Sequence, residues 1–396
     1  MRRVLHVVPA LAARYGGPST AALGMSRALR RAGVEALIVA TDADGPTRLP
    51  LPNGVPASFQ DVPVIAFRRV GGDAFKWSRG LSAWLARHVT DFDVVHVHAV
   101  FSHASWAACH AASRAGVPCI VRPLGTLDAW SLARHQRRKR ALFAMGLAAD
   151  LRAAAFMHYT SEAERRSAEA ALPWLPAGGV IPLGVDEACF DVGSEPADPP
   201  VVLMLSRLDP KKGIDVVIDA FHQLPSACDR WRLVIAGIGT PAYAARLRAM
   251  AAAGRAAARI SFPGWIDGTA RLHALRAASL VALASQQENF GLAVVEGLAA
   301  GVPAVVTPGV DLAGEIATAD AGWLAERTPA SMAGALTTAM TDADDRRRRG
   351  VVVCVFVVRF RWEAVASLVT DLYDRLASAR GSVSRAAIAA SAGGEA

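Results

Sequence analysis

Two short segments carry side chains whose types and spacing fit chemistry on a phosphorylated sugar. The first is SRLDPKKG (206–213), in which Arg207 and Lys212 directly follow an apolar run and open a helical pattern. An arginine and a lysine converging at such a point neutralise a pyrophosphate, the arginine as a bidentate fork and the lysine as a point charge. The chain has only four lysines, so the adjacent pair Lys211 and Lys212 is unusual in this composition.

The second segment carries two carboxylates, Glu288 and Glu296, eight positions apart. Glu288 falls in a loop after an apolar run, and Glu296 falls inside the next helical pattern. Carboxylates accept hydrogen bonds from hydroxyl groups, as sugar recognition requires. The free N–H groups at Phe290 and Gly291, where that helix begins, suit an oxyanion or a sugar hydroxyl. Two glutamates alone mean little, but beside the basic segment they favour a sugar-phosphate site.

A glycine-rich loop near the start of the chain, residues 14–19, is a third candidate. It follows the first predicted strand and precedes a helix for which Ser19 or Thr20 is the expected N-cap. Its glycines, Gly17 among them, allow backbone N–H groups to approach an anion. The loop is not GxGxxG and lacks the acidic partner of a nicotinamide site. An ordinary tight turn between strand and helix is the alternative.

The elements that must position these residues alternate as strand and helix, which predicts parallel sheets and the α/β class. The pattern runs through residues 1–186, including one long helix over 130–149, and restarts at 201. We expect two doubly wound, Rossmann-like domains that face a cleft, with ligands beyond the carboxyl ends of the strands. The expected divisions are a first domain 1–186, a linker 187–200, a second domain 201–361, a helix 362–380 packing back on the first domain, and a disordered tail 381–396.

Length and composition agree with that organisation. The 396 residues are 53% hydrophobic and 20% charged, which excludes long disorder over most of the chain. There is no apolar run of membrane-spanning length, and the N-terminus alternates like a strand rather than a signal peptide. The five scattered cysteines fit thiols in a reducing cytoplasm. A net charge of +8 suits phosphorylated ligands, an anionic membrane or nucleic acid without choosing among them.

Taken together, SRLDPKKG and Glu288-x7-Glu296, followed by GLAAGVPAVVT, resemble the retaining glycosyltransferases of family 4, which have the GT-B fold. The resemblance covers about residues 2–380 and includes the GGPS loop, RPLGTLDAW, YTSEAE, IPLGVD and FPGW. It implies a nucleotide-sugar donor, UDP- or GDP-linked, and a saccharide acceptor. It also implies that no metal or other cofactor is needed, because arginine and lysine take the metal's place.

The resemblance further implies individual roles. Arg207 and Lys212 would hold the diphosphate and stabilise the departing nucleoside diphosphate, on which charge builds in the transition state. Glu288, with the Phe290 and Gly291 amides, would hold the donor sugar. Catalytic roles therefore fall to Arg207, Lys212 and Glu288. Donor-binding roles fall to Gly17, Gly264, Trp265, Phe290, Gly291 and Glu296.

Among the donor-binding residues, Glu296 would bind the ribose hydroxyls, and Gly264 with Trp265 would lie near the base. Gly17 would approach the phosphates from the other domain. The chain departs from the family at Leu124, where many relatives have histidine or arginine that orients the substrates. We expect His98 and Arg122 to substitute in orienting the donor or the acceptor.

Three further segments leave alternatives open. Residues 351–358 (VVVCVFVV) replace the charged helix of relatives and suit a sequence error, a buried strand or an interfacial segment. His96, His98 and His103 could be weighed as a metal site, but they lack a carboxylate partner, and core or cleft histidines are favoured. Residues 130–143 mix bulky apolar and basic side chains, typical of a solvated helix face or of contact with an anionic membrane or lipid pyrophosphate.

The sequence thus predicts a cytoplasmic retaining glycosyltransferase, at the inner face of the cytoplasmic membrane if residues 130–143 bind lipid. The expected acceptor is a growing bacterial surface glycan on a lipid carrier, as in exopolysaccharide, capsule or lipopolysaccharide synthesis. The alternatives are a transferase that makes a small soluble glycoside, a GT-B nucleotide-sugar epimerase and a non-catalytic binder of anionic ligands. A nucleic-acid partner is not expected, because the basic residues gather at strand ends rather than along one face.

Overall fold

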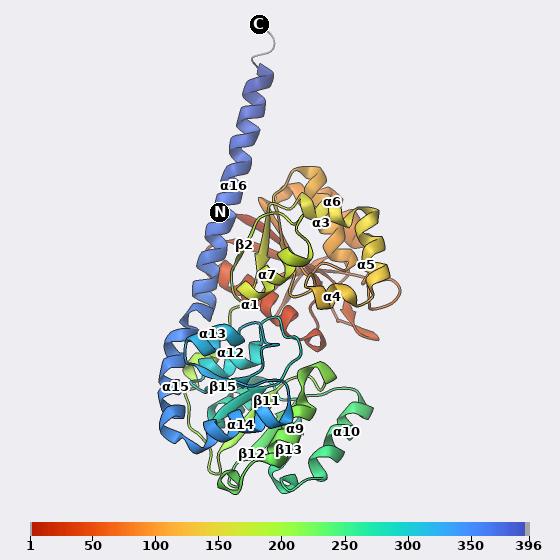
Figure 1. Ribbon diagram of the computed structural model, residues 1–396. Helices are drawn as coiled ribbons and strands as arrows, with labels where there is room; N and C mark the ends of the chain where they lie inside the picture. The colour runs from red at the N-terminus through yellow and green to blue at the C-terminus, as the bar shows by residue number, and fades with distance from the viewer. Residues whose placement is uncertain (1, 393–396) are drawn as a thin grey trace. The chain divides into compact units, whose positions relative to one another are not determined.

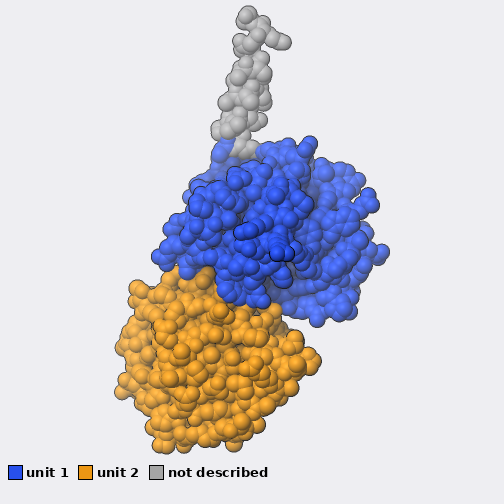
Figure 2. All heavy atoms as spheres, turned by 45° about the vertical axis from the view of Figure 1, so that its right-hand side comes forward, with its two compact units in different colours: residues 1–184, 362–396 blue, residues 185–361 orange. Residues whose placement is uncertain are grey.

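The computed structural model describes residues 2–392, with side chains up to Ala379. It divides into two compact units, coloured separately in Figure 2. The first unit consists of Met1–Gly184 together with the segment from Trp362 onward, and the second is Val185–Arg361. Each is a doubly wound α/β unit, as the sequence predicted.

The first unit is built on an eight-stranded sheet in the order β10-β9-β8-β7-β1-β2-β6-β5. Only β5 pairs antiparallel with its neighbour in this sheet. Strand order reverses at β1, which lies between β2 and β7. The strands are β1 (Arg3–Ala10), β2 (Glu35–Thr41), β5 (Pro56–Phe59), β6 (Val62–Phe67), β7 (Val94–His98), β8 (Cys119–Arg122), β9 (Phe156–Tyr159) and β10 (Gly178–Val180), with a separate pair β3 (Ala43–Asp44) and β4 (Thr47–Arg48).

Helices cover both faces of this sheet (Figure 1). The helices are α1 (Gly17–Arg31), α2 (Arg79–His88), α3 (His103–Ala115), α4 (Ala129–Ala133), α5 (Gln136–Leu142), α6 (Ala148–Arg152), α7 (Glu162–Ala171) and α16 (Trp362–Ala392), with a π-helical turn at Phe143–Leu147. Because strand side chains alternate, Leu5 packs with α2 and α3, whereas Val4 packs with α1 and α16. The latter face also receives the polar residues His6, His96 and Tyr373.

The second unit has a six-stranded sheet, parallel throughout, in the order β13-β12-β11-β14-β15-β16. Strand order reverses at β11, and loops at such a reversal form the usual ligand crevice. The strands are β11 (Val201–Leu205), β12 (Arg232–Ala236), β13 (Ile260–Gly264), β14 (Leu280–Leu283), β15 (Ala304–Val306) and β16 (Gly322–Leu324). The helices are α8 (Glu187–Asp191), α9 (Ile214–Gln223), α10 (Pro241–Ala252), α11 (Gly268–Ala277), α12 (Leu292–Ala299), α13 (Ala313–Thr318), α14 (Pro329–Thr341) and α15 (Ala343–Phe356).

The expected linker over 187–200 is instead a packed part of the second unit. Asp186 caps α8 by accepting a hydrogen bond from the Ala188 amide, and Cys189 on this helix is buried. The amides of Glu195 and Ala197 donate to carbonyl groups of residues 276 and 277. The crossing between units therefore lies at 184/185, ahead of the proline-rich stretch that suggested a linker.

The second crossing lies at 361/362, where α16 begins. Its residues Val365, Val369 and Leu372 are buried in one core with Met25 and Leu29 of α1. The helix continues to Ala392, so the backbone is helical over residues 381–392, where disorder was predicted. Residues 393–396 of that predicted tail lie outside the described part of the chain.

Residues 351–358 are helical rather than extended, which excludes the buried strand among the three alternatives left open. Asp342 caps α15, and Arg348 and Arg349 pair with Asp345 in the first turn. Val353 and Val357 are buried, and this burial compensates for the modest helix penalty of β-branched residues. Val351 and Val355 are 72% and 79% exposed.

Candidate functional site

The basic segment forms the loop between β11 and α9. Asp209 closes a 3₁₀ turn over Pro210–Lys212 by accepting a hydrogen bond from the Lys211 amide at 3.0 Å. Gly213 follows at φ 64°, and a Cβ there would collide with the carbonyl of Ala284 at the end of β14. Glycine therefore allows the loops that follow β11 and β14 to pack together.

This packing brings two predicted catalytic residues together. The Lys212 ammonium forms an ion pair with the Glu288 carboxylate, and both side chains are largely shielded from solvent. Backbone hydrogen bonds hold Glu288 in place, since its amide donates to Gly309 and its carbonyl accepts from Asp311. A ligand diphosphate must therefore compete with Glu288 for the lysine.

Arg207, the third predicted catalytic residue, is exposed and forms no ion pair or hydrogen bond with the residues that the structure describes. It lies near enough to Lys211 to act on it electrostatically. Burial lowers the pKa of Lys211, and the charges of Lys212 and Arg207 lower it further. Three cationic groups are thus concentrated where β11 ends, an arrangement that favours an anion.

The N-terminus of α12 follows soon after Glu288, the ion-pair partner of Lys212, in the sequence. Gly291 is its N-cap at φ 80°, and Val310 is close to the position of a Cβ there. Within the described chain, the N–H groups of Phe290, Gly291 and Leu292 have no hydrogen-bond acceptor. The Phe290 ring is buried against Phe360, so only its backbone can serve a ligand.

Glu296, the predicted ribose ligand, lies in α12 and is paired with an arginine that belongs to none of the motifs described above. Arg271 of α11 forms an ion pair with Glu296 and lies 3.6 Å from Asp186. Burial raises the pKa of Glu296, and Arg271 opposes that shift. No sequence pattern connects residues 25 positions apart on different helices, and only the fold places them together.

Gly264, predicted with Trp265 to lie near the base, is the last residue of the edge strand β13, and Trp265 follows it. Gly264 adopts φ 86°, and its carbonyl accepts a hydrogen bond from Gly237 at the end of β12. Trp265 is 49% exposed, and its indole nitrogen donates to Asp267 at 3.2 Å. An exposed aromatic ring at a strand end can stack on a nucleobase.

Gly17 belongs to the first unit, whereas the other predicted donor-binding residues belong to the second. It is the first residue of α1, which follows the Gly16 N-cap at φ 74°. The helix begins before the expected Ser19 or Thr20 cap, because Pro18 fits its first turn. Ser19 instead donates to the Ala10 carbonyl and ties the helix to β1.

His98 and Arg122 lie at the carboxyl ends of β7 and β8, but both are fully buried. This corrects the expectation that they orient a substrate directly, because neither side chain reaches the surface. The Arg122 guanidinium donates to His98 Nδ1 at 3.4 Å. The location of His98 and Arg122 at strand ends could be predicted from the sequence. That their side chains point into the core depends on the helices packed over that face of the sheet.

The loop after β8, residues 123–126, is held at one end by the buried Arg122 and further along by Glu164. Glu164 is buried, and its carboxylate accepts hydrogen bonds from the Gly125 amide at 2.6 Å and from the Thr160 amide and hydroxyl at 2.7 Å. Burial raises the pKa of Glu164. In the sequence, Glu164 forms a helix-capping box with Ser161, which explains why it lies in the first turn of a helix. The capping box did not indicate that Glu164 would also bind this loop. Leu124 between these anchors has φ 56°, an uncommon conformation that clusters at functional sites.

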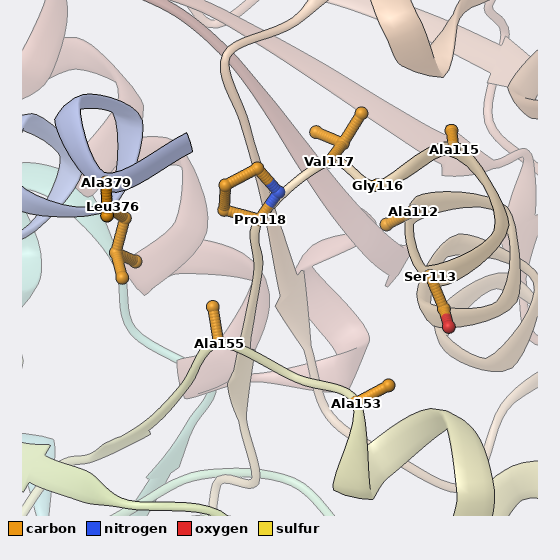
Figure 3. A pocket seen from close by; sticks show the side chains of 10 residues that line it. All are labelled: Ala112, Ser113, Ala115, Gly116, Val117, Pro118, Ala153, Ala155, Leu376 and Ala379. Carbon is orange, nitrogen blue, oxygen red and sulfur yellow. The ribbon is translucent and has the colours of Figure 1, made fainter. Parts of the chain in front are cut away.

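A groove of about 600 Å³ lies elsewhere in the first unit, where Pro118 leads into β8 (Figure 3). Leu376 and Ala379 of α16 line it together with small residues such as Ala112, Ser113 and Ala155. It lies at the amino end of the strand and has no charged lining, so it does not suit a diphosphate.

Comparison with known families matches two models on this chain. The model described as "Glycosyl transferase 4-like domain" matches residues 16–184, and "Glycosyl transferases group 1" matches residues 186–350. The two matches follow the two units closely.

Curated relatives match over shorter stretches. A GDP-mannose-dependent alpha-(1-6)-phosphatidylinositol dimannoside mannosyltransferase of Mycobacterium tuberculosis is 37% identical over 179 residues, covering 43% of this chain and 45% of the relative. A D-inositol 3-phosphate glycosyltransferase of Acidothermus cellulolyticus is 30% identical over 221 residues, covering 51% and 49%. The matches thus span about half the length of these relatives.

Solved structures match over nearly the whole chain and show the fold. HepE of Anabaena, in complex with UDP and glucose, has a TM-score of 0.74 at 19% identity and covers 95% of this chain and 100% of its own. Sucrose-phosphate synthase of Thermosynechococcus elongatus has a TM-score of 0.76 at 20% identity and covers 96% and 100%.

Proposed function

We propose a reaction for this chain, which belongs to the group 1 glycosyl transferases of family 4 and has the GT-B fold. The reaction is the transfer of a sugar from a UDP- or GDP-sugar to a saccharide acceptor with retention of configuration. One observation carries the proposal. The Lys212–Glu288 ion pair, the N-terminus of α12 and Arg207, which has no ion-pair partner among the described residues, all belong to the strand ends of one unit.

The ion pair implies that Lys212 changes its anionic partner when the donor binds. When a diphosphate arrives, Lys212 turns from Glu288 to the phosphate oxygens, and Arg207 adds its guanidinium fork. Glu288 is then free to accept hydrogen bonds from sugar hydroxyls. As the bond between the anomeric carbon and the diphosphate breaks, charge builds on the leaving group, and the two cations with the α12 amides stabilise it. The acceptor oxygen bonds the anomeric carbon on the same face while its proton passes to an oxygen of the departing diphosphate, and no metal ion takes part.

For the acceptor, we propose a lipid-linked saccharide of a bacterial surface glycan, such as exopolysaccharide, capsule or lipopolysaccharide, at the inner face of the cytoplasmic membrane. A second basic stretch, residues 129–149 between β8 and β9, supports this. Residues 129–149 contain no acidic side chain, and Arg137, Arg138 and Arg140 are exposed on or beside α5. Met145, in the π-helical turn, is 61% exposed. Among the described residues, no helix has both the length and the apolar character to cross a bilayer.

The sequence of residues 130–143 led us to expect a cationic patch of Arg137, Lys139 and Arg140, and the structure corrects its make-up. The single helix expected over 130–149 is broken, at His135 with φ 52° and at Gly146 with φ 123°. Lys139 turns inward, where its ammonium donates to the Ser131 carbonyl and lies 4.6 Å from the centre of the Phe101 ring. The patch is therefore Arg137, Arg138 and Arg140, while Lys139 closes the hairpin of α4 and α5.

A panel of nucleotide sugars in a thermal-shift experiment tests the function. A ligand that binds only the folded protein raises its melting temperature, so one UDP- or GDP-sugar should do so. That donor should then release nucleoside diphosphate slowly in water and faster with a lipid-linked acceptor. No stabilisation by any nucleotide sugar and no diphosphate release would overturn the proposal. Conversion of the donor into an epimer, or transfer only to small soluble acceptors, would establish one of the alternative reactions instead.

A further inference from the structure

A buried polar cluster crosses one face of the first sheet, beneath α1 and α16. His6 of β1 pairs in register with His96 of β7, and His98 of β7 pairs with Arg122 of β8. His158 of β9 and Tyr373 of α16 complete the cluster. All six side chains are buried, in a layer otherwise filled with aliphatic residues.

The six side chains form one continuous hydrogen-bond chain. It begins at the Ile181 carbonyl, 2.8 Å from His158 Nε2. His158 Nδ1 lies 3.1 Å from His96 Nε2, and His96 Nδ1 lies 2.7 Å from the Tyr373 hydroxyl. That hydroxyl lies 3.4 Å from His6 Nε2, and His6 Nδ1 lies 3.0 Å from His98 Nε2. The chain ends where Arg122 Nη1 lies 3.4 Å from His98 Nδ1.

The two ends fix the direction of every hydrogen bond. A carbonyl can only accept, so His158 must carry its proton on Nε2 and accept at Nδ1. Each following ring likewise accepts at Nδ1 and must donate from Nε2, so every ring carries its proton on Nε2. At the far end it leaves His98 Nδ1 as an acceptor, and a guanidinium can only donate. One proton arrangement therefore satisfies all six bonds with neutral rings.

The surroundings keep the rings in that state. Burial, together with the charge of Arg122, lowers the pKa of His6 and His158 to about 3. Nitrogen atoms of His6, His96 and His98 lie within 4.8 Å of one another, close enough for a metal to be considered. Each Nδ1 lone pair already accepts a hydrogen bond, however, and a buried guanidinium adjoins the group, so a cation is disfavoured.

We infer that Tyr373 is a positioning residue for the 123–126 loop, acting through His6, His98 and Arg122. Tyr373 is the one link supplied by a helix rather than by the sheet. At the other end, Nε and Nη2 of Arg122 have no hydrogen-bond partner among the described residues. The bond to His98 therefore orients the guanidinium, and the Glu164 carboxylate attracts it electrostatically. Arg122 directly precedes the loop whose Gly125 amide Glu164 binds. The inference rests on the proposed function in assigning this loop to substrate orientation.

Long-range ¹H–¹⁵N spectra of histidine-labelled protein test the chain without any substrate. We expect four neutral rings protonated on Nε2, unchanged when Zn²⁺ is added. Tyr373→Phe removes the donor to His96 and the acceptor of His6, so both sets of ring signals should shift. A ring protonated on Nδ1, a charged ring, or tight Zn²⁺ binding at these rings would overturn the inference.

Kinetics test the positioning role separately. With the nucleotide sugar that stabilises the wild-type protein, Tyr373→Phe should lower kcat for nucleoside diphosphate release about tenfold, the effect of one buried hydrogen bond. The Kd for UDP or GDP should change less than about twofold, since the second unit binds it. Tyr159→Phe is the matched control, because Tyr159 is buried in the same unit and its hydroxyl has no partner among the described residues.

The control should keep both the wild-type spectrum and kcat. An equal loss of kcat in Tyr159→Phe would overturn the inference, as would shifted histidine signals with normal kcat in Tyr373→Phe. If the wild-type protein releases no nucleoside diphosphate from any nucleotide sugar, the proposed function fails, while the spectra still decide whether the chain has the assigned direction.

Discussion

Lys212 and Glu288 form an ion pair between the loop that follows β11 and the loop that follows β14. The pair links the two sequence segments that first indicated chemistry, although 76 positions separate its members. The charge of Lys212 is therefore already balanced by Glu288 in the free protein. If Lys212 binds the donor diphosphate as proposed, donor binding exchanges one anionic partner of Lys212 for another.

Removal of either cation should nearly abolish transfer. Arg207→Ala and Lys212→Ala should each lower kcat by a factor on the order of 10² to 10³, the usual effect of losing one group that stabilises transition-state charge. Stability should fall little in Arg207→Ala, because Arg207 is exposed. The measurement is steady-state release of nucleoside diphosphate, with Arg230→Ala as a control at an exposed arginine of the same unit. Near-normal rates in both variants would contradict the assignment.

Glu288→Gln should separate binding from catalysis. An amide cannot form an ion pair with Lys212, so the lysine is released and the Kd for UDP or GDP should fall several-fold. The same variant loses a carboxylate acceptor for the sugar hydroxyls, so kcat should fall on the order of a hundredfold. Calorimetry and initial rates measure the two quantities. Weaker nucleotide binding together with a normal kcat would show that the pair has no such role.

Chelation should leave activity intact. If Arg207 and Lys212 neutralise the diphosphate, EDTA should not reduce the rate of transfer, and added Mg²⁺ or Mn²⁺ should not increase it. The rate is measured after dialysis against chelator, with each metal then restored. Loss of activity that magnesium or manganese reverses would contradict the metal-free mechanism.

Stability should fall as the pH drops below about 6.5, the ordinary pKa of histidine. Burial lowers the pKa of His6 and His158 to about 3, so the unfolded chain binds protons first. Their contribution is complete above pH 6.5 and is lost as the pH falls toward 3. Two such groups give a slope of roughly 3 kcal/mol per pH unit. Urea unfolding at pH 7.5, 6.5 and 5.5 measures it, and the raised pKa of Glu164 acts in the opposite direction. A flat profile would contradict neutral burial of these rings.

The patch of Arg137, Arg138 and Arg140 should bind anionic liposomes. Each basic group near such a surface contributes about 1 kcal/mol, so three give a salt-sensitive affinity of about 3 kcal/mol. Sedimentation with anionic liposomes should be strong, weak with zwitterionic ones, and lost above a few hundred millimolar salt, roughly, as screening shortens the field. Replacing all three by glutamate should abolish binding while donor hydrolysis persists.

A matched control for the patch changes the same charge elsewhere on the first unit. The exposed residues Arg87, Arg114 and Arg166 lie on α2, α3 and α7. Their triple replacement by glutamate should leave liposome binding largely intact. Equal loss in both triple variants would show that net charge, and not the α5 patch, determines the attraction.

Much of the fold could be predicted because it rests on local patterns. Apolar strand runs alternate with helices, and the pattern restarts at 201, which fixes two sheets. The basic loop could be placed because Gly213 and the lysines follow a strand directly. Pairs such as Arg271–Glu296 and His96–Tyr373 could not, since their members come from separate helices or from opposite ends of the chain. The helix over 351–356 was missed because propensity favoured extension, whereas burial of Val353 and Val357 decided the outcome.

The return of α16 to the first unit has a consequence for synthesis on the ribosome. Val365, Val369 and Tyr373 complete a core begun by Val4 and Met25, so the first unit emerges unfinished. The sheet face that carries the histidines lacks α16 until the whole second unit has been translated. A chain terminated at Arg361 would contain every residue assigned here to donor binding, yet it would lack the tyrosine that closes the buried hydrogen-bond chain. Premature termination between the second unit and α16 therefore damages the unit that was made first.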